Sequence, residues 1–314
     1  MANPAFERIL KTTGAAIEAL GRLSLSDLNS ALMEVFRVKS RGRTAAKVMR
    51  DYLSNRFVIP SALDPVSFAA SEAKLLAIAH AHGFQPLILS PLAPFGTCAI
   101  SGFADQNKIV TALRGTEVVA DATNVLALEA AIRRKENHKT DTDLHLCSSH
   151  RHVRGQSFPM GKGFTAHFQV FCAVSAGKDT GSFGFEKRAL LKHLELHTAF
   201  VLDQTPFRDI RITIKAIREK DVENTMAHTV FAHIESHLRR EHVSLAFEDV
   251  PVDDHRYYDR LRFSIDVIHG GTTFNIGDGG TVRWAQMLTG NHKERMLTSG
   301  IGTELIWKLA NGLG

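Results

Sequence analysis

The stretch from residue 144 to residue 174 constrains the fold most, because its polar and apolar residues alternate with a period of two. Successive side chains of a β-strand point to opposite faces, so this alternation predicts two strands. An apolar row in the second half, from Phe164 to Cys172, would form one side of the resulting hairpin. The other side is expected to carry His150, His152, Arg154, His167 and Gln169. We therefore expect an antiparallel hairpin with one apolar and one polar face.

The loop between these strands, residues 157–163, is longer than a tight hairpin needs and places Lys162 between two glycines. Such a loop has the length and the charge to close over an anionic ligand. An ordinary antiparallel pair with a polar outer face remains the alternative interpretation.

The composition is that of a globular chain: 314 residues, 44% hydrophobic and 23% charged. We see no apolar run long enough to span a bilayer, and the first residues carry charges where a signal peptide would be apolar. We therefore expect a cytoplasmic protein without membrane contact. The cysteines Cys98, Cys147 and Cys172 have no C-x-x-C spacing, which argues against a disulfide framework.

The formal net charge of +5 is concentrated at the N-terminus, where residues 1–60 hold ten basic and five acidic residues. The basic residues are densest over residues 37–56. This segment is a candidate surface for RNA or for an acidic carrier protein. A solvated helical face explains the same pattern and is the simpler interpretation, because no series of aromatic stacking positions is interleaved with the charges.

Periodicity predicts a basic helical N-terminal segment over residues 1–62 and a core over residues 63–314, separated by a proline-containing linker. In the core, strands come in adjacent pairs more often than in strict alternation with helices. The predicted class is therefore α+β, with a mainly antiparallel sheet flanked by helices. Residues 275–280 are expected to form a tight glycine turn.

The order of these parts resembles the catalytic core of a class II aminoacyl-tRNA synthetase, most closely the histidyl-tRNA synthetase branch and its truncated paralogues. The helix ending at Gly83 and the proline-bearing strand after it resemble motif 1, the dimerisation element. Arg154, its loop and Phe168 resemble motif 2, and residues 300–304 resemble motif 3. Residues 254–258 resemble the histidine-specific tyrosine motif, and residues 278–280 resemble the glycine turn that follows it.

The resemblance implies a homodimeric ligase that uses ATP and Mg²⁺ to activate an amino acid or related carboxylic acid as its adenylate. A carrier or a tRNA acceptor end would then receive the acyl group. The implied catalytic residues are Arg154 and Lys162, for the phosphates. Cofactor contacts would come from Arg154, Gln156, Lys162, Phe168, Gly302 and Glu304. Substrate contacts would come from Arg114, Thr116, Glu117, His150, His152, His167, Gln169, Tyr257, Tyr258, Gly279 and Gly280. Glu117 or Asp266 is the expected neighbour of Mg²⁺.

Several positions depart from the family pattern. Leu305 stands where motif 3 has an arginine, Gln156 where motif 2 has a glutamate, and Asp253 and Ala173 replace two further family residues. The chain also ends after motif 3, so we expect no anticodon-binding domain. These departures favour the alternative function, a non-catalytic paralogue that senses a metabolite as a regulatory subunit.

A metal site at His150, His152 and His167 is a third interpretation. Alternation sends His145 and Cys147 to the opposite strand face, so these two cannot complete it. Ordinary pocket histidines explain the pattern as well, and we expect no metal site there.

Overall fold

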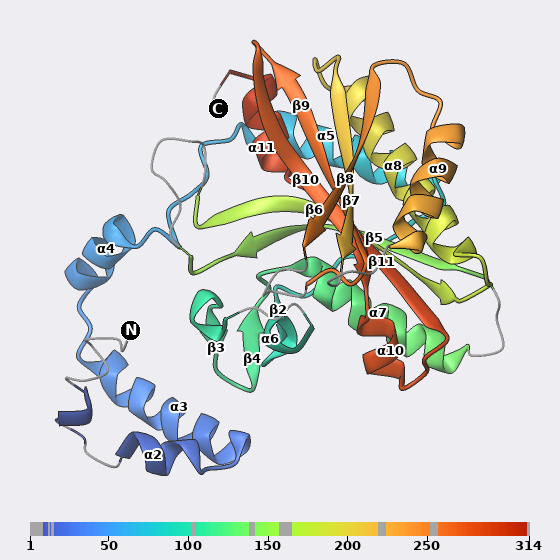
Figure 1. Ribbon diagram of the computed structural model, residues 1–314. Helices are drawn as coiled ribbons and strands as arrows, with labels where there is room; N and C mark the ends of the chain where they lie inside the picture. The colour runs from blue at the N-terminus through green and yellow to red at the C-terminus, as the bar shows by residue number, and fades with distance from the viewer. Residues whose placement is uncertain are drawn as a thin grey trace.

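The computed structural model describes residues 9–11, 13, 16–101, 105–137, 142–156, 165–218, 224–251 and 257–312. Its main element is an eight-stranded sheet in the order β1-β5-β6-β11-β10-β9-β7-β8 (Figure 1). The strands are β1 (Gln85–Pro86), β5 (Leu144–Val153), β6 (His167–Lys178), β7 (Ile210–Arg218), β8 (Val243–Pro251), β9 (Leu261–His269), β10 (Thr272–Val282) and β11 (Glu294–Ile301).

The sheet is mainly antiparallel, as the sequence predicts. The exceptions are two parallel pairs, β1 with β5 and β7 with β8, at the two edges. A second sheet of three short strands pairs β2 (Leu92–Pro94) with β4 (Thr116–Val118) and β4 with β3 (Thr111–Ala112). The fold class α+β with a large sheet flanked by helices is therefore confirmed.

Helices cover both faces of the large sheet. One face packs on α5 (Pro65–Ala81), α8 (Gly184–Gln204), α9 (Thr225–His237) and α11 (Thr303–Ala310), and this core buries Leu194 and Phe263 completely or almost completely. The other face packs on α7 (Ala122–Glu136) and α10 (Trp284–Thr289), with Leu126 and Trp284 in its core. The remaining short elements are α6 (Thr97–Ser101) and the 3₁₀ helix η1 (Gln106–Lys108).

Local sequence signals set where the important helices begin. Asp121 caps α7, because its carboxylate accepts the backbone N–H of Thr123. Asp64 caps α5 in the same way, and Pro65 occupies the first turn, where its missing N–H costs no hydrogen bond. The start of α7 therefore follows directly from its sequence, which is important because it forms one wall of the cavity described below.

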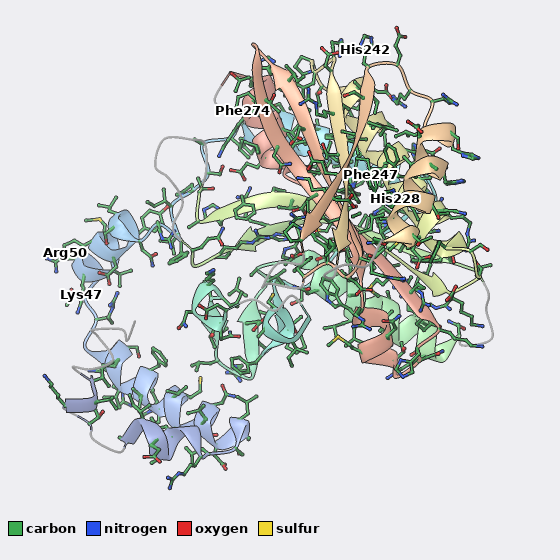
Figure 2. All side chains as sticks on the ribbon, in the orientation of Figure 1. Lys47, Arg50, His228, His242, Phe247 and Phe274 are labelled. Atoms are coloured by element: carbon green, nitrogen blue, oxygen red, sulfur yellow. The ribbon has the colours of Figure 1, made fainter. Side chains whose placement is uncertain are left out.

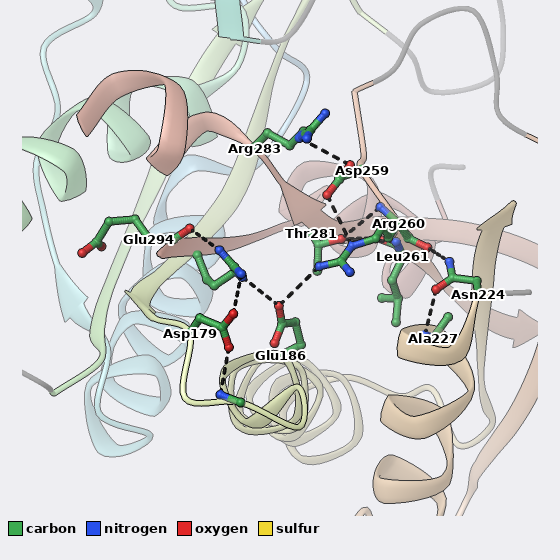
Figure 3. Close-up of polar contacts among 12 residues, drawn as sticks. Asp179, Glu186, Asn224, Ala227, Asp259, Arg260, Leu261, Thr281, Arg283 and Glu294 are labelled. Carbon is green, nitrogen blue, oxygen red and sulfur yellow. Dashed lines mark hydrogen bonds and ion pairs between the residues drawn. The ribbon is translucent and has the colours of Figure 1, made fainter. Parts of the chain in front are cut away.

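A polar network ties α8 and α9 to one end of the sheet (Figure 3). The buried carboxylate of Glu186, in the first turn of α8, lies 3.9 Å from the guanidinium of Arg260 and 3.5 Å from that of Arg295. Asn224 caps α9 by accepting the N–H of Ala227, and its amide donates to the backbone oxygen of Arg260. Because the charged groups have partners, this network is adequately explained as structural.

The N-terminal helices are α2 (Ala16–Gly21), α3 (Leu25–Arg41) and α4 (Ala45–Ser54), and none of them buries a residue. One contact to the core is the hydrogen bond from the backbone N–H of Arg114 to the side-chain oxygen of Asn29. In Figure 2, Lys47 and Arg50 lie on α4, away from the large sheet. No ion pair to either side chain is found among the described residues.

The expected tight glycine turn at residues 275–280 is wrong. Residues 275–280 do not form a turn but belong to strand β10, and the turn lies earlier, at Gly270 and Gly271, which both have positive φ. Glycine is required inside the strand because a Cβ at Gly279 would lie 2.5 Å from the ring of Phe263.

None of the helices in the described part of the chain combines the length and the apolar composition that are needed to span a bilayer.

The expected division of the hairpin into a polar and an apolar face is also wrong. His152 pairs with Phe168, and His150 pairs with Val170. Directly opposed residues share a face, so the histidines of β5 lie with the apolar row of β6 and not with His167. A shift of one residue in register moves every side chain of a strand to the other face, and alternation within each strand does not fix which residues of the two strands are opposed.

Candidate functional site

A cavity of about 250 Å³ opens on the α7 face of the large sheet, between the start of α7 and the strands β5, β6, β10 and β11. Its polar lining residues include Asp121, Thr123, His152, Arg154, Gln169, Tyr257, Tyr258, Asn275, Asp278, Thr298 and Glu304. Its apolar lining includes Phe168, Val170 and Leu305. This combination of apolar walls and a few convergent polar groups is typical of a small-molecule site.

Asp121 is the most strongly organised group of the cavity. One oxygen accepts the backbone N–H of Thr123 at 2.9 Å and its hydroxyl at 2.6 Å. The other accepts the hydroxyl of Tyr257 at 2.8 Å. Burial raises the pKa of Asp121, but the nearby Arg154 and these hydrogen bonds outweigh it and hold the pKa below its usual value. Asp121 is therefore a fixed negative charge at neutral pH.

A second carboxylate, Asp278, is oriented in a similar way. It accepts the hydroxyl of Tyr258 at 2.8 Å. The ring of Tyr258 lies against Gly280, where a Cβ would be 2.7 Å from the ring and 2.3 Å from the backbone oxygen of Leu261. Gly280 is thus needed for the close approach of the tyrosine, although it does not itself line the cavity.

Arg154 supplies positive charge to the cavity. Its Nε donates to the backbone oxygen of Ala120 at 2.8 Å, and its guanidinium lies 5.2 Å from the ring centre of Phe168. The same guanidinium is 4.0 Å from Asp121. About one third of the side chain is exposed, so a ligand in the cavity could reach it. Among the described lining residues it is the single arginine or lysine.

His152 and Cys172 form a buried, uncharged part of the wall. The Nε2 of His152 accepts the first N–H of α7, from Ala122, which leaves the hydrogen on Nδ1. Burial lowers the pKa of His152 to about 3, so the ring is neutral. Burial also raises the pKa of the Cys172 thiol well above its usual value, so Cys172 is not a ready nucleophile.

Glu304, at the start of α11, is a lining carboxylate whose charge is already compensated. It pairs with Lys308 at 3.0 Å and with Arg151 at 3.0 Å, and Ser61 donates to it at 2.7 Å. Gln169 donates its backbone N–H to the same carboxylate at 3.3 Å. Glu304 therefore stabilises the junction of α11 and β6, and its charge is not available to a ligand in the way that the charge of Asp121 is.

The structure brings about half of the expected site residues together. The lining includes Arg154, Phe168, Gly302, Glu304, His152, Gln169, Tyr257 and Tyr258. Lys162, Asp253 and most of the tyrosine motif at residues 254–258 lie outside the described residues. The residues that do not line the cavity are Gln156, Arg114, Thr116, Glu117, His150, His167, Gly279 and Gly280.

Three of the expected substrate contacts, Arg114, Thr116 and Glu117, lie elsewhere. Arg114 is in the turn between β3 and β4, and the hydroxyl of Thr116 donates to the oxygen of Leu113. Glu117 is fully buried and accepts the backbone N–H groups of Gly96 and Cys98. Glu117 is thus used to hold the turn before α6, and it is also unavailable to Mg²⁺.

Asp121 and Thr123, a few residues later, are the acid and hydroxyl that reach the cavity. The sequence contained a signal for them: an aspartate directly before a helical pattern, with a threonine two residues on, is typical of a helix N-cap. Asp266, the other expected neighbour of Mg²⁺, lies outside the cavity lining and accepts a hydrogen bond from Asn275.

The three histidines considered as metal ligands do not converge. His150 contacts the backbone oxygen of Ser90, and His167 contacts that of Ile59, whereas His152 binds the start of α7. In the part of the chain that the structure describes, no three His, Cys, Asp or Glu side chains are grouped so that they could hold a metal ion.

The chain is similar to known proteins in structure but not in sequence. No family model and no curated protein sequence matches the chain. An ATP phosphoribosyltransferase regulatory subunit/histidyl-tRNA synthetase from Bacillus halodurans is similar in structure, with a TM-score of 0.61 and 12% identity over 82% of this chain and 83% of that one. A histidine–tRNA ligase subunit from Alicyclobacillus acidocaldarius gives a TM-score of 0.59 and 13% identity, over 81% and 96% of the two chains.

Pyrrolysyl-tRNA synthetase from Desulfitobacterium hafniense is similar over 99% of this chain and 90% of its own, with a TM-score of 0.50 and 13% identity. These neighbours are class II synthetases or synthetase-like proteins. At such low identity the likeness concerns the fold, and it confirms the resemblance that the sequence motifs indicated. The chain therefore has a class II aminoacyl-tRNA synthetase-like fold, of the kind found in histidyl-tRNA synthetase-like proteins.

Proposed function

We propose that the cavity binds a small zwitterion, an amino acid or a close analogue with both an amine and a carboxylate. The arrangement of Asp121 and Arg154 carries this proposal. Their opposite charges lie 4.0 Å apart at the cavity wall. An ammonium group would pair with Asp121, and the neighbouring carboxylate of the same ligand would reach the guanidinium of Arg154.

The other polar groups support an ammonium ligand. Asp121 keeps its charge because Arg154 lies beside it and Thr123 and Tyr257 donate to it, and Asp278 adds a second oriented carboxylate. The cavity volume of about 250 Å³ is slightly below the 300–1,000 Å³ range of drug-sized pockets, as expected for a small metabolite. In this proposal Asp121 and Thr123 make the substrate contacts that the resemblance implied for Thr116 and Glu117.

In this proposal the protein is a synthetase-like binding module. Leu305 lines the cavity where the family pattern has an arginine, so the described lining offers one guanidinium and the carboxylates of Asp121 and Asp278. That balance suits a cationic amine better than a triphosphate. A metabolite-sensing regulatory subunit is a function consistent with such a site, and one neighbour's name includes a regulatory subunit.

Formation of an acyl-adenylate is the second candidate function. It is favoured by the guanidinium of Arg154 held over the ring of Phe168, because a planar ring and a fixed cation together could receive a nucleotide. ATP and Mg²⁺ would supply the activated phosphorus and the charge neutralisation. The described carboxylates do not fit the expected Mg²⁺ role, since Glu117 is buried and Asp266 is outside the cavity, so we derive no step through these groups.

Calorimetric titration separates the two functions. The chain is titrated with each of the twenty common amino acids, first alone and then with ATP and Mg²⁺, and amino-acid-dependent pyrophosphate exchange is measured in parallel. The binding module predicts heat with at least one amino acid in the absence of ATP, and no exchange. Exchange with any amino acid would select the ligase instead, and the absence of binding to all twenty under both conditions would count against both functions.

A homodimer is also proposed, through the segment that resembles motif 1. Val66 in α5 is 78% exposed and Ile88, after β1, is fully exposed, which is unusual for large apolar side chains. A second copy of the chain would cover them. Light scattering that gives a mass near 34.6 kDa at micromolar concentration would contradict this proposal.

A further inference from the structure

A short segment before α5, residues 56–61, contacts residues that line the cavity or adjoin its lining, and we name it the strap. The guanidinium of Arg56 donates to two successive backbone oxygens, those of Gly155 at 2.6 Å and Gln156 at 2.8 Å. These two residues directly follow Arg154. In Figure 1 the chain between α4 and α5 passes beside the free end of the β5–β6 hairpin, as these contacts require.

The strap makes two further contacts, and each is next to a residue that lines the cavity. The backbone oxygen of Ile59 lies 2.6 Å from Nε2 of His167, which precedes the lining residue Phe168. The hydroxyl of Ser61 donates to Glu304 at 2.7 Å, and Glu304 itself lines the cavity. The strap therefore joins the ends of β5 and β6 and the start of α11.

Among the described residues, two backbone hydrogen bonds also hold the chain at Arg154 and Gly155. The N–H of Arg154 donates to Ala166 at 3.0 Å, and that of Gly155 donates to the oxygen of Lys108 at 2.7 Å. Gly155 is closely packed there, since a Cβ on it would lie 3.1 Å from that same oxygen. Without Arg56, the oxygens of Gly155 and Gln156 would lose their contact to the N-terminal segment.

We propose that Arg56 is a positioning residue for Arg154. The planar guanidinium of Arg56 donates hydrogen bonds to the carbonyl groups of the two residues that follow Arg154. These bonds fix the backbone from which the side chain of Arg154 extends toward Ala120 and Phe168. A planar fork can hold two oxygens at once, whereas the ammonium of a lysine acts as a single flexible charge. The positioning role itself does not depend on the proposed function. Its consequence does rest on the proposed function, because a well-positioned Arg154 would bind the ligand's carboxylate more tightly.

Amide hydrogen exchange of the full chain, without any ligand, tests the inference. In Arg56→Ala, which removes both hydrogen bonds, the amides of Arg154 and Gly155 should exchange at least roughly tenfold faster, since loss of one charge-assisted hydrogen bond alone would produce a change of about that size. Amides at the far end of β5, residues 144–148, should be unchanged. Arg56→Lys should restore part of the protection. The matched control is Arg22→Ala, which removes the same charge from an exposed arginine of the N-terminal segment.

A second measurement follows the side chain itself. Phenylglyoxal modifies exposed guanidinium groups, and peptide mapping reports the rate at Arg154 alone. That rate should rise several-fold in Arg56→Ala and stay unchanged in Arg22→Ala. Unchanged exchange and unchanged modification at residue 154 would overturn the proposal. Faster exchange across the whole of β5 would overturn it too, because Arg56 would then stabilise the fold in general. Neither readout involves an amino acid, so failure of the proposed function would not affect them.

Discussion

The buried ion pair between α7 and β11 makes the strongest stability prediction. Two hydrogen bonds join Arg134 to Glu294, at 2.9 Å and 3.0 Å, and both side chains are about 5% exposed or less. Removing Glu294 takes away the carboxylate that accepts both of these hydrogen bonds, and breaking a buried ion pair in this way costs about 3–5 kcal/mol. Glu294→Gln should therefore strongly destabilise the protein. With an m-value of about 3 kcal/mol per molar urea, the midpoint of unfolding falls by roughly 1–1.7 M.

The double variant Arg134→Met with Glu294→Met sharpens the test, because it removes both charges and keeps apolar volume. Replacement of a whole buried pair by apolar residues is often neutral or stabilising, so the double variant should be much more stable than Glu294→Gln. Glu18→Gln, which breaks an exposed pair with Arg22, serves as the control and should change stability by less than about 1 kcal/mol. A midpoint shift for Glu294→Gln as small as that of the control would refute the reasoning.

Three further predictions concern packing, pH and charge. Gly280→Ala should displace an adjacent tyrosine ring and lower the thermal midpoint by several degrees, measured by circular dichroism. Burial lowers the pKa of His197 to about 3, so below pH 6.5 the unfolded chain binds more protons than the folded chain. The free energy of unfolding should therefore fall as the pH falls from 6.5 toward 3, which urea unfolding at each pH would measure. If the basic segment binds RNA, Lys47→Glu with Arg50→Glu should weaken binding of a labelled single-stranded RNA and lower its salt dependence, measured by fluorescence anisotropy. The matched control reverses two exposed lysines outside the N-terminal segment, Lys74 and Lys293. Equal binding by both variants would exclude the basic segment as an RNA surface.

The elements of the fold were largely predictable, because strong periodicity marks them locally. The hairpin of β5 and β6, the helix after Asp121 and the alternating strand β9 all follow from their own residues. Strand β11 was not expected, because residues 294–301 show no clean alternation. This strand is central and covered on both faces, and such strands are not required to alternate.

The site was less predictable, because it depends on register and on which turn reaches the cavity. Alternation placed Arg154 on the face of His152, and the family resemblance added Phe168. His167 was placed on the wrong face, because alternation within each strand does not fix which residues of the two strands are opposed. The family resemblance points to Thr116 and Glu117 as substrate contacts because their residue types match. Only the three-dimensional arrangement shows that Glu117 is buried in strand β4, where it binds the turn before α6, and that Asp121 reaches the cavity.

The central claim is that Asp121 recognises the amine of a small zwitterion, and side-by-side calorimetry of Asp121→Asn and the unaltered chain tests it most directly. Asparagine also caps helices well, so α7 should stay folded while the negative charge is lost. Asp209→Asn is the control, since that carboxylate is 67% exposed. The account predicts that Asp121→Asn weakens amino-acid binding by roughly 10- to 100-fold, the loss of a charge-assisted hydrogen bond, whereas Asp209→Asn leaves it unchanged. Equal affinity in Asp121→Asn and the unaltered chain would contradict it.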